Sequence, residues 1–350
     1  MTRVGVDARA HALGVLGALI PPGTRCALLD FPRHANVGDS AIWLGERALL
    51  DDLGVELAYV ADRDTFSPEQ LAARIPPGTG TILLHGGGNL GDLWPHAQAH
   101  REAVIKAFPG HRIIQLPQSM RFLDSANLDR ARAVLDAHPD LTLLMRDRAG
   151  LRAARAAFRA PSLLCPDSAQ TLPDLSTNTA PRHHVLWLAR TDHEAEERWP
   201  TEGGPHVLRT DWNARQGADP EWSARMAEAE RNLDAASFES GRAWTDRSVA
   251  DLVVACDRYA TLHLQRGCRL LESARVVITD RLHGHLLCRL VGRPSVILDD
   301  RHGKLGDYRV TWPDNDRPSA ATLCEALRAA QHLAGTGTFG PRVVCSAITA

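Results

Sequence analysis

The sequence carries almost no net charge of either sign. Its 350 residues include 40 Lys and Arg against 42 Asp and Glu, which gives a formal net charge of −2 at pH 7. A surface that binds nucleic acid is built on a clear excess of positive charge. The composition therefore gives no support to nucleic acid as a partner, and any basic site has to be local.

Cysteine is scarce, and its spacing excludes two common kinds of site. The seven Cys residues include no C-x-x-C pair. That absence argues against both a zinc cage and a redox dithiol, and it favours a reducing compartment. Because no His, Cys and carboxylate set has metal-ligand spacing either, we expect no metal ion and no other cofactor.

Long apolar runs are missing as well. No run reaches the roughly 18 residues that a membrane-spanning helix needs. The longest candidate near the start, Ala12 to Ile20, follows Asp7 and His11 and precedes two prolines, and it has no small-x-small cleavage site. We interpret it as a docking helix rather than a secretion signal, and we expect a cytoplasmic protein.

The pattern of apolar residues alternates between strand and helix periods along most of the chain. Strands are predicted at 26–31, 55–60, 81–84, 112–116, 141–145, 162–165 and 184–188, and helices between most of them. Such alternation predicts an α/β fold with parallel strands, whose ligands gather at the carboxyl ends of the strands. The polar stretch at 175–181 has no periodicity and predicts a boundary between residues 1–175 and 182–350.

The richest cluster of chemistry lies in the stretch VVITDRLHGHLLCRL, residues Val276 to Leu290. A β-branched run ends at Asp280, and apolar residues with helical spacing begin after Arg281. Such a strand-to-helix turn points backbone N–H groups and the positive end of a helix dipole at one spot. With Arg281, His283 and His285 at that turn, the stretch predicts a place to hold an anion and move a proton.

A second polar cluster follows the next apolar strand, Ser295 to Leu298. It comprises Asp299, Asp300, Arg301, His302, Gly303 and Lys304. Two polar clusters at the ends of neighbouring strands indicate one site.

These stretches closely resemble the polysaccharide pyruvyl transferase family. The run LQRGCRLLESARVVITDRLHGHLLCRLVGRPSVILDDRHGKLGDYRVTW, Leu264 to Trp312, has that family's TDRLHGH turn, its G-x-P and its GK step before a Tyr. The first half adds NVGDSAIWLGE, LLHGGGNLGDLWP, LPQS and MRD in the family's order. Only the segment from about Thr191 to Val249 has no match, and Asp300, Arg301 and His302 depart from the family's usual residues before GK.

The resemblance implies a fold of two Rossmann-like domains that face each other across a cleft, as in GT-B glycosyltransferases. Residues 1–175 would form the acceptor side and 182–350 the donor side. The implied reaction transfers pyruvate from phosphoenolpyruvate to a sugar of a polysaccharide or glycolipid precursor, forming a pyruvate ketal and releasing phosphate. The partners would be phosphoenolpyruvate and a saccharide or lipid-linked saccharide, and the latter would bring the protein to a membrane surface peripherally.

A donor with a phosphate and a carboxylate needs cations and N–H donors around it. The candidate cations are Arg146, Arg281 and Lys304, and the candidate N–H groups lie in the turn Gly86, Gly87 and Gly88. His283, within the triplet Arg281, Leu282 and His283, matches the family's donor-contacting residues. Its ordinary pKa suits proton transfer, but the sequence leaves open which transfer it performs.

Other residues have two interpretations of similar weight. Asn36, Asp39 and Asn89 can contact the acceptor sugar or serve as caps and turn residues. His285 lies two residues beyond His283 on a predicted helix, so it should point elsewhere and support the site from behind. Asp280 can orient a His or simply end its strand. Trp199, Trp212 and Trp222 can line a sugar subsite or pack in the core.

Two other functions remain open at this point. A GT-B glycosyltransferase that uses a nucleotide sugar fits the same fold, since fold does not fix function. A catalytically inactive sugar-binding relative is the third hypothesis, and intact Arg146, Arg281 and His283 count against it. The identity of the donor separates the first two.

Overall fold

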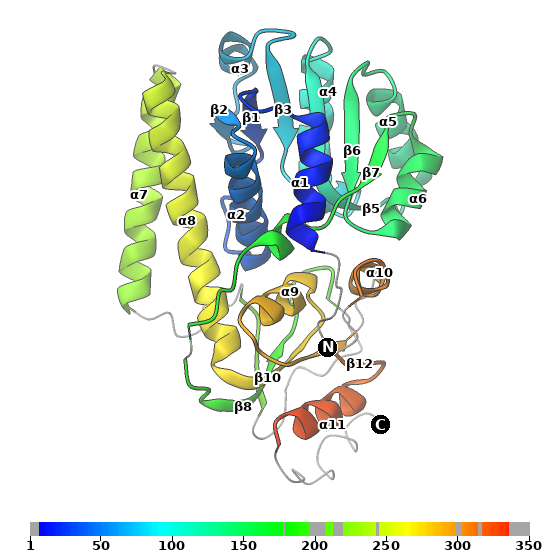
Figure 1. Ribbon diagram of the computed structural model, residues 1–350, viewed down its shortest axis with the longest axis vertical. Helices are drawn as coiled ribbons and strands as arrows, with labels where there is room; N and C mark the ends of the chain where they lie inside the picture. Colours follow the sequence, from blue (N-terminus) through cyan, green and yellow to red (C-terminus); the bar gives the residue numbers. More distant parts are fainter. Residues whose placement is uncertain are drawn as a thin grey trace.

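The first of two parallel β-sheets is built by the N-terminal half of the chain. The computed structural model describes residues 7–177, 179–195, 207–212, 220–242, 245–298, 303–313 and 317–335. The strands of this sheet are β1 (Arg25–Leu29), β2 (Glu56–Ala61), β3 (Gly80–Leu84), β4 (Gly87–Gly91), β5 (Arg112–Arg121), β6 (Leu141–Met145) and β7 (Ser162–Leu164). Their order is β2-β1-β3-β5-β6-β7, with β4 paired to β5 (Figure 1).

Helices cover both faces of this sheet because successive strand residues point to opposite sides. In β1, Cys26 and Leu28 join one core, while Ala27 and Leu29 join the other. The first core is covered by α1 (Ala8–Leu19) and α2 (Val37–Asp52). The second is covered by α3 (Pro68–Arg74), α4 (Pro95–Ala107), α5 (Ser125–Leu135) and α6 (Arg148–Ala157).

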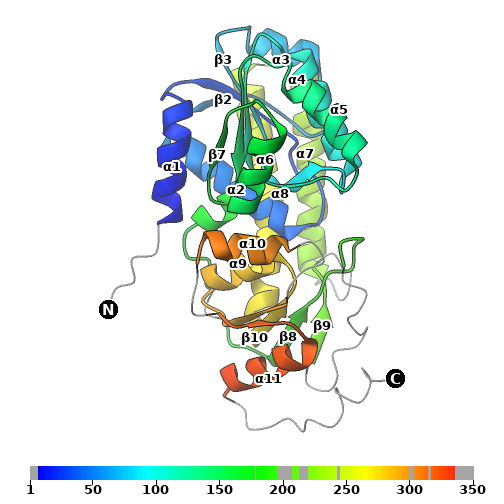
Figure 2. The same cartoon turned by 90° about the vertical axis from the view of Figure 1, so that its right-hand side faces the viewer.

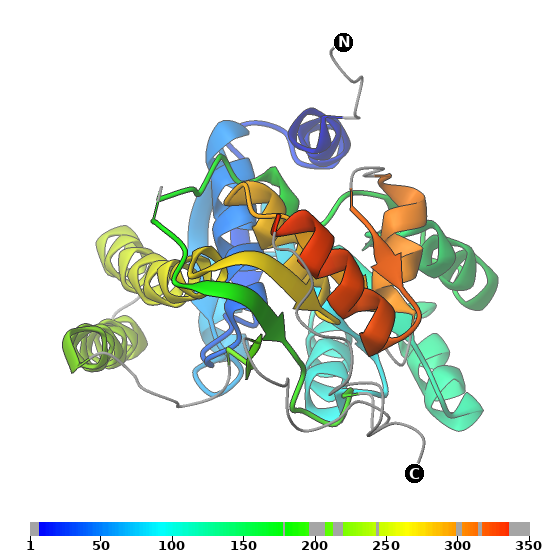
Figure 3. The same ribbon diagram turned by 90° about the horizontal axis from the view of Figure 1, so that it is seen from below.

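The second sheet is smaller and has the same layered arrangement. It contains β8 (His183–Leu188), β9 (Val207–Thr210), β10 (Ala274–Thr279), β11 (Ser295–Leu298) and β12 (Ser319–Ala320), all parallel, in the order β12-β11-β10-β8-β9. One face packs on α11 (Leu323–Leu333), which lies across the strands in Figure 3. The other packs on α9 (Leu282–Leu290) and on part of α8 (Asp246–Glu272).

Helix α8 connects the two halves. Together with α7 (Pro220–Arg242) it forms the long pair of helices at the left of Figure 1. Its 27 residues span about 40 Å. The N-terminal part of α8 packs on the first core, which α1 and α2 also cover. Leu264, Cys268 and Leu271, further along α8, belong to the core of the second sheet. Helix packing thus crosses the predicted boundary at 175–181, and the division into two domains stays a prediction.

Further contacts join the two sheets next to this helix. The short 3-10 helix η1 (Ser168–Thr171) contacts α2 and α9, and α10 (Lys304–Thr311) contacts α6. Figure 2 shows α9 and α10 lying directly below the first half of the molecule. The carboxyl ends of strands from both sheets are therefore brought toward one region.

Most predicted elements are present within the described residues, with shifted ends. The docking helix predicted at 12–20 is α1, and the N-cap Asp7 accepts hydrogen bonds from two N–H groups of its first turn. The segment Val253 to Arg258 lies inside α8, and its buried residues pack on the first core. Within the described residues, no helix is both long enough and apolar enough to cross a membrane.

Candidate functional site

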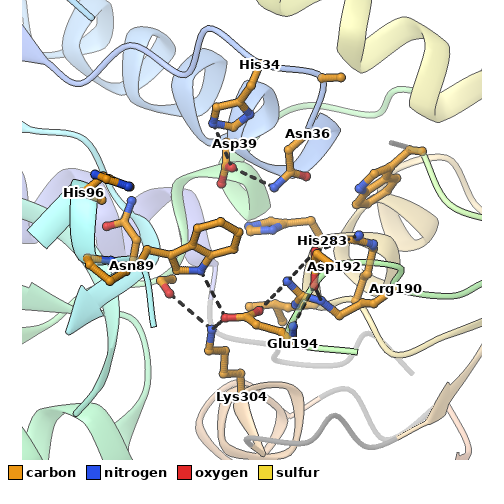
Figure 4. Close-up of a pocket in the computed structure, with 18 of the residues that line it drawn as sticks. His34, Asn36, Asp39, Asn89, His96, Arg190, Asp192, Glu194, His283 and Lys304 are labelled. Atoms are coloured by element: carbon orange, nitrogen blue, oxygen red, sulfur yellow. Dashed lines mark hydrogen bonds and ion pairs between the residues drawn. The ribbon is translucent and has the colours of Figure 1, made fainter. Parts of the chain in front are cut away.

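A pocket of about 530 Å³ lies where the two sheets meet. This is the ordinary size of a small-molecule site. Nine of the twelve predicted site residues line it: Asn36, Asp39, Gly88, Asn89, Arg146, Arg281, Leu282, His283 and Lys304. Figure 4 shows His34, Asn36 and Asp39 of the first half opposite Lys304 and Glu194 of the second.

Asp167 joins two of the predicted catalytic residues. Its Oδ2 atom accepts from Arg146 Nη1 at 2.9 Å and contacts His283 Nε2 at 3.1 Å. Burial alone would raise the pKa of the Asp167 carboxyl, but the adjacent His283 and Arg146 outweigh it and hold that pKa well below its usual range. Asp167 is therefore an anion at working pH, and it fixes a guanidinium and an imidazole side by side.

Arg146 occupies its position because it directly follows a buried strand. Its backbone N–H donates to Gln118 O, which extends the pairing of β5 with β6, and its Nε donates to Ser119 Oγ at 2.7 Å. The side chain is almost fully buried and reaches the pocket wall, next to Gly88. A Cβ at Gly88 would lie 3.1 Å from Arg146 Nη2, so glycine gives the guanidinium its room.

Arg281 is held in a fixed orientation from the second sheet. It is the N-cap of α9, and its Nε and Nη2 donate to the two carboxylate oxygens of Asp211 at 2.8 and 2.6 Å. Nη2 also contacts Asp192 at 3.2 Å, and the guanidinium lies over the ring of Trp212 at 5.5 Å. The two-pronged face of this guanidinium is therefore used by Asp211.

His283 enters the pocket from the first turn of α9 and lies against the start of α2. A Cβ at Gly38 would lie 2.5 Å from His283 Nδ1, so only glycine permits this approach. Asn36 caps α2 by accepting from the Gly38 N–H, and its amide also donates to Asp39 at 2.8 Å. Both interpretations of Asn36 thus have support, since it is a cap and it lines the pocket.

A second group of charges lies at the end of the pocket near α10. Lys304 Nζ donates to Glu194 Oε1 at 2.5 Å and to Gly88 O at 3.3 Å. Burial lowers the pKa of Lys304, although Glu194 opposes that shift. Arg190 pairs with Asp192 and with Glu194. Each of these cations is matched by a carboxylate of the chain, which fixes its position before any ligand binds.

The three glycines of the predicted turn differ in their contact with the pocket. Gly88 lines the pocket, but Gly86 and Gly87 are not among its lining residues. The Gly86 N–H donates to the buried carboxylate of Glu46, and the Asn89 N–H donates to Gln118. The N–H groups of Gly86 and Asn89 therefore already have partners in the protein, and a role of the Gly86 to Gly88 turn in holding an anion stays a prediction.

The remaining candidate residues also differ in whether they line the pocket. His285 points away from the pocket, as expected two residues beyond His283, and its Nδ1 contacts Ser295 Oγ at 3.2 Å. Asp280 accepts from the backbone N–H of Arg190, which favours its structural interpretation. Trp212 lines the pocket but is only 2% exposed, and Trp222 packs on the first core. Trp199 and the residues 299–302 lie outside the described residues.

Several site residues were missed by the sequence reasoning. Asp167 comes three residues after the end of β7, and Arg190, Asp192 and Glu194 follow β8, so their position after an apolar strand was a usable signal. Asp211 follows β9, a short strand that has no clear pattern in the sequence. Trp94 lies within the stretch LLHGGGNLGDLWP, but the sequence reasoning did not single it out. Among the described residues no group of three or more His, Cys, Asp or Glu could hold a metal ion, and metal independence stays a prediction.

Comparison with known proteins connects this geometry to a family. The sequence matches the model of the polysaccharide pyruvyl transferase family over residues 36–302. Pyruvyl transferase 1 of Schizosaccharomyces pombe is 34% identical over 82% of this chain and 69% of its own length. The EpsO protein of Bacillus subtilis is 28% identical over 84% of this chain and 87% of its own length.

A solved structure adds a likeness of fold. An uncharacterised protein of Klebsiella pneumoniae is similar with a TM-score of 0.53 at 15% identity, covering 92% of this chain and 100% of that one. It agrees with an α/β fold of parallel sheets and says nothing about activity. The family match, in contrast, spans most of the chain, including Arg146, Asp167, Arg281 and His283. The chain belongs to the polysaccharide pyruvyl transferase family, and this membership indicates a pyruvyl transferase.

Proposed function

We propose that the protein transfers pyruvate from phosphoenolpyruvate to two hydroxyl groups of one sugar, forming a pyruvate ketal and releasing phosphate. The acceptor is a saccharide, free or lipid-linked, of a polysaccharide or glycolipid precursor. The observation that carries this proposal is the convergence of Arg146 and His283 on Asp167 in a pocket that Arg281 and Lys304 also line. Cations and a proton-transfer group thus lie together, which is what this donor requires.

The charges of the pocket fit a donor with two anionic groups. Phosphoenolpyruvate carries a phosphate and a carboxylate on a three-carbon frame, and guanidinium groups bind both well. Arg146 approaches from the first sheet, and Arg281 and Lys304 from the second. We infer that the two sheets belong to two Rossmann-like domains facing each other across this pocket, in the GT-B manner, with the donor between them.

The chemistry needs one proton delivered to carbon and two removed from hydroxyl groups. Protonation of C3 makes C2 an electrophile, and a sugar hydroxyl attacks it. Phosphate then leaves, and a second hydroxyl of the same sugar closes the ketal. One hydroxyl proton is balanced by the proton gained at C3, and the other by the proton gained by phosphate. The proposal assigns one of these transfers to His283, whose imidazole lines the pocket.

The proposed reaction neutralises the donor with the cations of the chain and uses no metal ion or other cofactor. Activity should therefore persist in EDTA. Loss of activity in EDTA, restored by a divalent ion, would contradict this part of the proposal.

The test is phosphate release from phosphoenolpyruvate in the presence of a panel of saccharides. Product that contains a ketal methyl group in its proton NMR spectrum, formed together with phosphate, is the expected result. An Arg146→Ala variant is the control for background release. Consumption of a nucleotide sugar with no use of phosphoenolpyruvate would contradict the proposal and favour a glycosyltransferase.

A further inference from the structure

Trp94 differs from the other tryptophans that the structure describes. Trp43, Trp187, Trp212 and Trp312 are buried, and Trp222 packs on the first core, whereas Trp94 is 38% exposed and lines the pocket. A large apolar side chain left open in a pocket is informative, because burial of an aromatic ring is strongly favourable. The ring is therefore available to a ligand.

The indole is held in place by the second half of the molecule. Its Nε1–H donates to Glu194 Oε1 at 3.2 Å, and its ring meets the ring of His193 edge-on, with centroids 4.4 Å apart. At its backbone, Trp94 occupies the N-cap of α4 directly before Pro95. A ring fixed in this way loses little conformational freedom when a ligand stacks on it.

Hydrogen-bonding side chains surround the same space. The pocket is lined by Trp94 together with His34, Asn36, Asp39, Asn89 and His96. Figure 4 labels these last five residues around the pocket. A ligand that fits such a wall has hydroxyl groups at its edge and a face of C–H bonds, which an aromatic face attracts. Carbohydrates combine these two features.

We propose that Trp94 is the stacking platform for the acceptor, a hexopyranose whose C–H face lies on the indole ring. This inference rests on the proposed function, because it places the acceptor beside the donor cations Arg146 and Arg281. The contact with Glu194 supports this placement of the acceptor. The same carboxylate binds both the indole of Trp94 and Lys304, one of the candidate donor cations. Trp94 thus sets which sugar enters, whereas the cations hold the donor.

The experiment measures both Michaelis constants in Trp94→Ala and Trp94→Phe. The acceptor is the saccharide that gives the most phosphate release with wild-type protein. For Trp94→Ala the acceptor KM should rise roughly tenfold, the loss expected for one stacking contact, while the donor KM changes less than about twofold. Trp94→Phe keeps a ring face and should retain most acceptor affinity. Trp222→Phe removes an indole outside the pocket and is the matched control.

A binding measurement makes the result independent of turnover. Methyl glycosides of galactose, glucose and N-acetylglucosamine are titrated while indole fluorescence is followed, and the change should be present in wild-type and Trp222→Phe protein and absent in Trp94→Phe. An unchanged acceptor KM in Trp94→Ala, a donor KM that rises equally, or quenching by a nucleotide in place of the glycosides would overturn the inference. Absence of phosphoenolpyruvate turnover in wild-type protein that still binds a glycoside through Trp94 would overturn the proposed function alone.

Discussion

Asp167 is the residue on which the candidate catalytic groups converge. Its low pKa keeps it ionised, so it attracts both Arg146 and the His283 ring. A carboxylate that binds an imidazole at one nitrogen fixes the orientation of the ring. The other nitrogen of His283, Nδ1, lies beside Gly38 at the start of α2. The pair His283 and Asp167 therefore has the arrangement of a proton-transfer group with a fixed partner.

His283→Asn separates chemistry from binding. If His283 transfers a proton, Asn should lower kcat by about 10² to 10⁴, while calorimetric titration of phosphoenolpyruvate should show a much smaller loss of affinity, because the arginines hold the donor. The contact with Asp167 is made by Nε2 of His283, which Asn is too short to replace but the amide of Gln can reach. A role in hydrogen bonding alone would therefore leave the turnover of a His283→Gln variant near the wild-type value. Single-turnover rates decide between the two outcomes.

At the scale of secondary-structure elements, α2 is packed so closely that its glycines decide the geometry. A Cβ at Gly45 would lie 2.0 Å from the carbonyl oxygen of Ser168, the residue that follows Asp167. Gly38, in the first turn of α2, likewise has no room for a side chain, because a Cβ there would lie 2.5 Å from His283 Nδ1. The position of α2 therefore sets the positions of Asp167 and His283.

Gly45→Ala should push α2 away from η1. We expect a loss of about 1–3 kcal/mol or more in the free energy of unfolding, as for other overpacked sites, together with a fall in activity because Asp167 moves. Gly14→Ala is the matched control, since Gly14 lies in α1 with nothing within 4 Å of a Cβ, and it should be neutral or stabilising by up to about 1 kcal/mol. Thermal unfolding of both variants makes the comparison. Equal stability of the two would contradict the packing argument.

The buried pair of Glu46 and His85 ties α2 to the turn after β3 and should make stability depend on pH. His85 Nδ1 lies 2.7 Å from Glu46 Oε2, and although burial opposes it, the Glu46 charge raises the pKa of His85 to about 9. The raised pKa of His85 adds to the free energy of unfolding. This contribution is fully present below about pH 6.5, the pKa of His85 in the unfolded chain, and is lost as pH rises through 9. Urea unfolding should show a loss of up to about 3 kcal/mol across that window.

Glu46→Gln is the control for this dependence. It removes the carboxylate that raises the His85 pKa, so its unfolding free energy should be lower at pH 6 and nearly flat between pH 7 and 9. A wild-type curve that is equally flat over this range would show that the pair is not charged in the folded protein.

On the scale of the whole molecule, the pocket is complete only when the two sheets are held together. Arg146 follows β6 in the first sheet and Arg281 follows β10 in the second, and both line one pocket. Helix α8 packs on the cores of both sheets and so joins them. Arg146 donates hydrogen bonds to Asp167 and Arg281 donates to Asp211, each within its own half, and both guanidinium groups also line the pocket.

Arg146→Ala and Arg281→Ala should each raise the donor KM strongly. The corresponding Lys variants should rescue poorly. At position 281 an ammonium cannot hold both oxygens of Asp211 and also contact the donor, and at position 146 it cannot hold Asp167 and Ser119 together and also contact the donor. Steady-state kinetics with phosphoenolpyruvate as the varied substrate measure this. Donor binding that is unchanged in both Ala variants would refute the assignment of the two arginines to the donor.

A large part of the fold and the site could be predicted from local sequence. Strands such as Leu141–Met145 and His183–Leu188 are short apolar runs followed by polar residues, and the run before Asp280 carries its own β-branched signal. Arg281 and His283 stand at the turn after such a run and were predicted from it. Arg146 directly follows another run, although the family resemblance was what singled it out. The same rule would have found Asp167 and Arg190, which also follow strands.

The sequence by itself determined the order of strands and helices, the charge types at the strand ends and the close resemblance to one family. These depend on neighbours in the chain, where periodicity and capping act over a few residues. Only the tertiary structure decided that Asp167 links Arg146 to His283, that Asp211 occupies the two-pronged face of Arg281, and that Trp94 meets Glu194 from the other half. Those contacts join residues 21 to 116 positions apart, and packing of helices on two sheets brings them together, which no local pattern records.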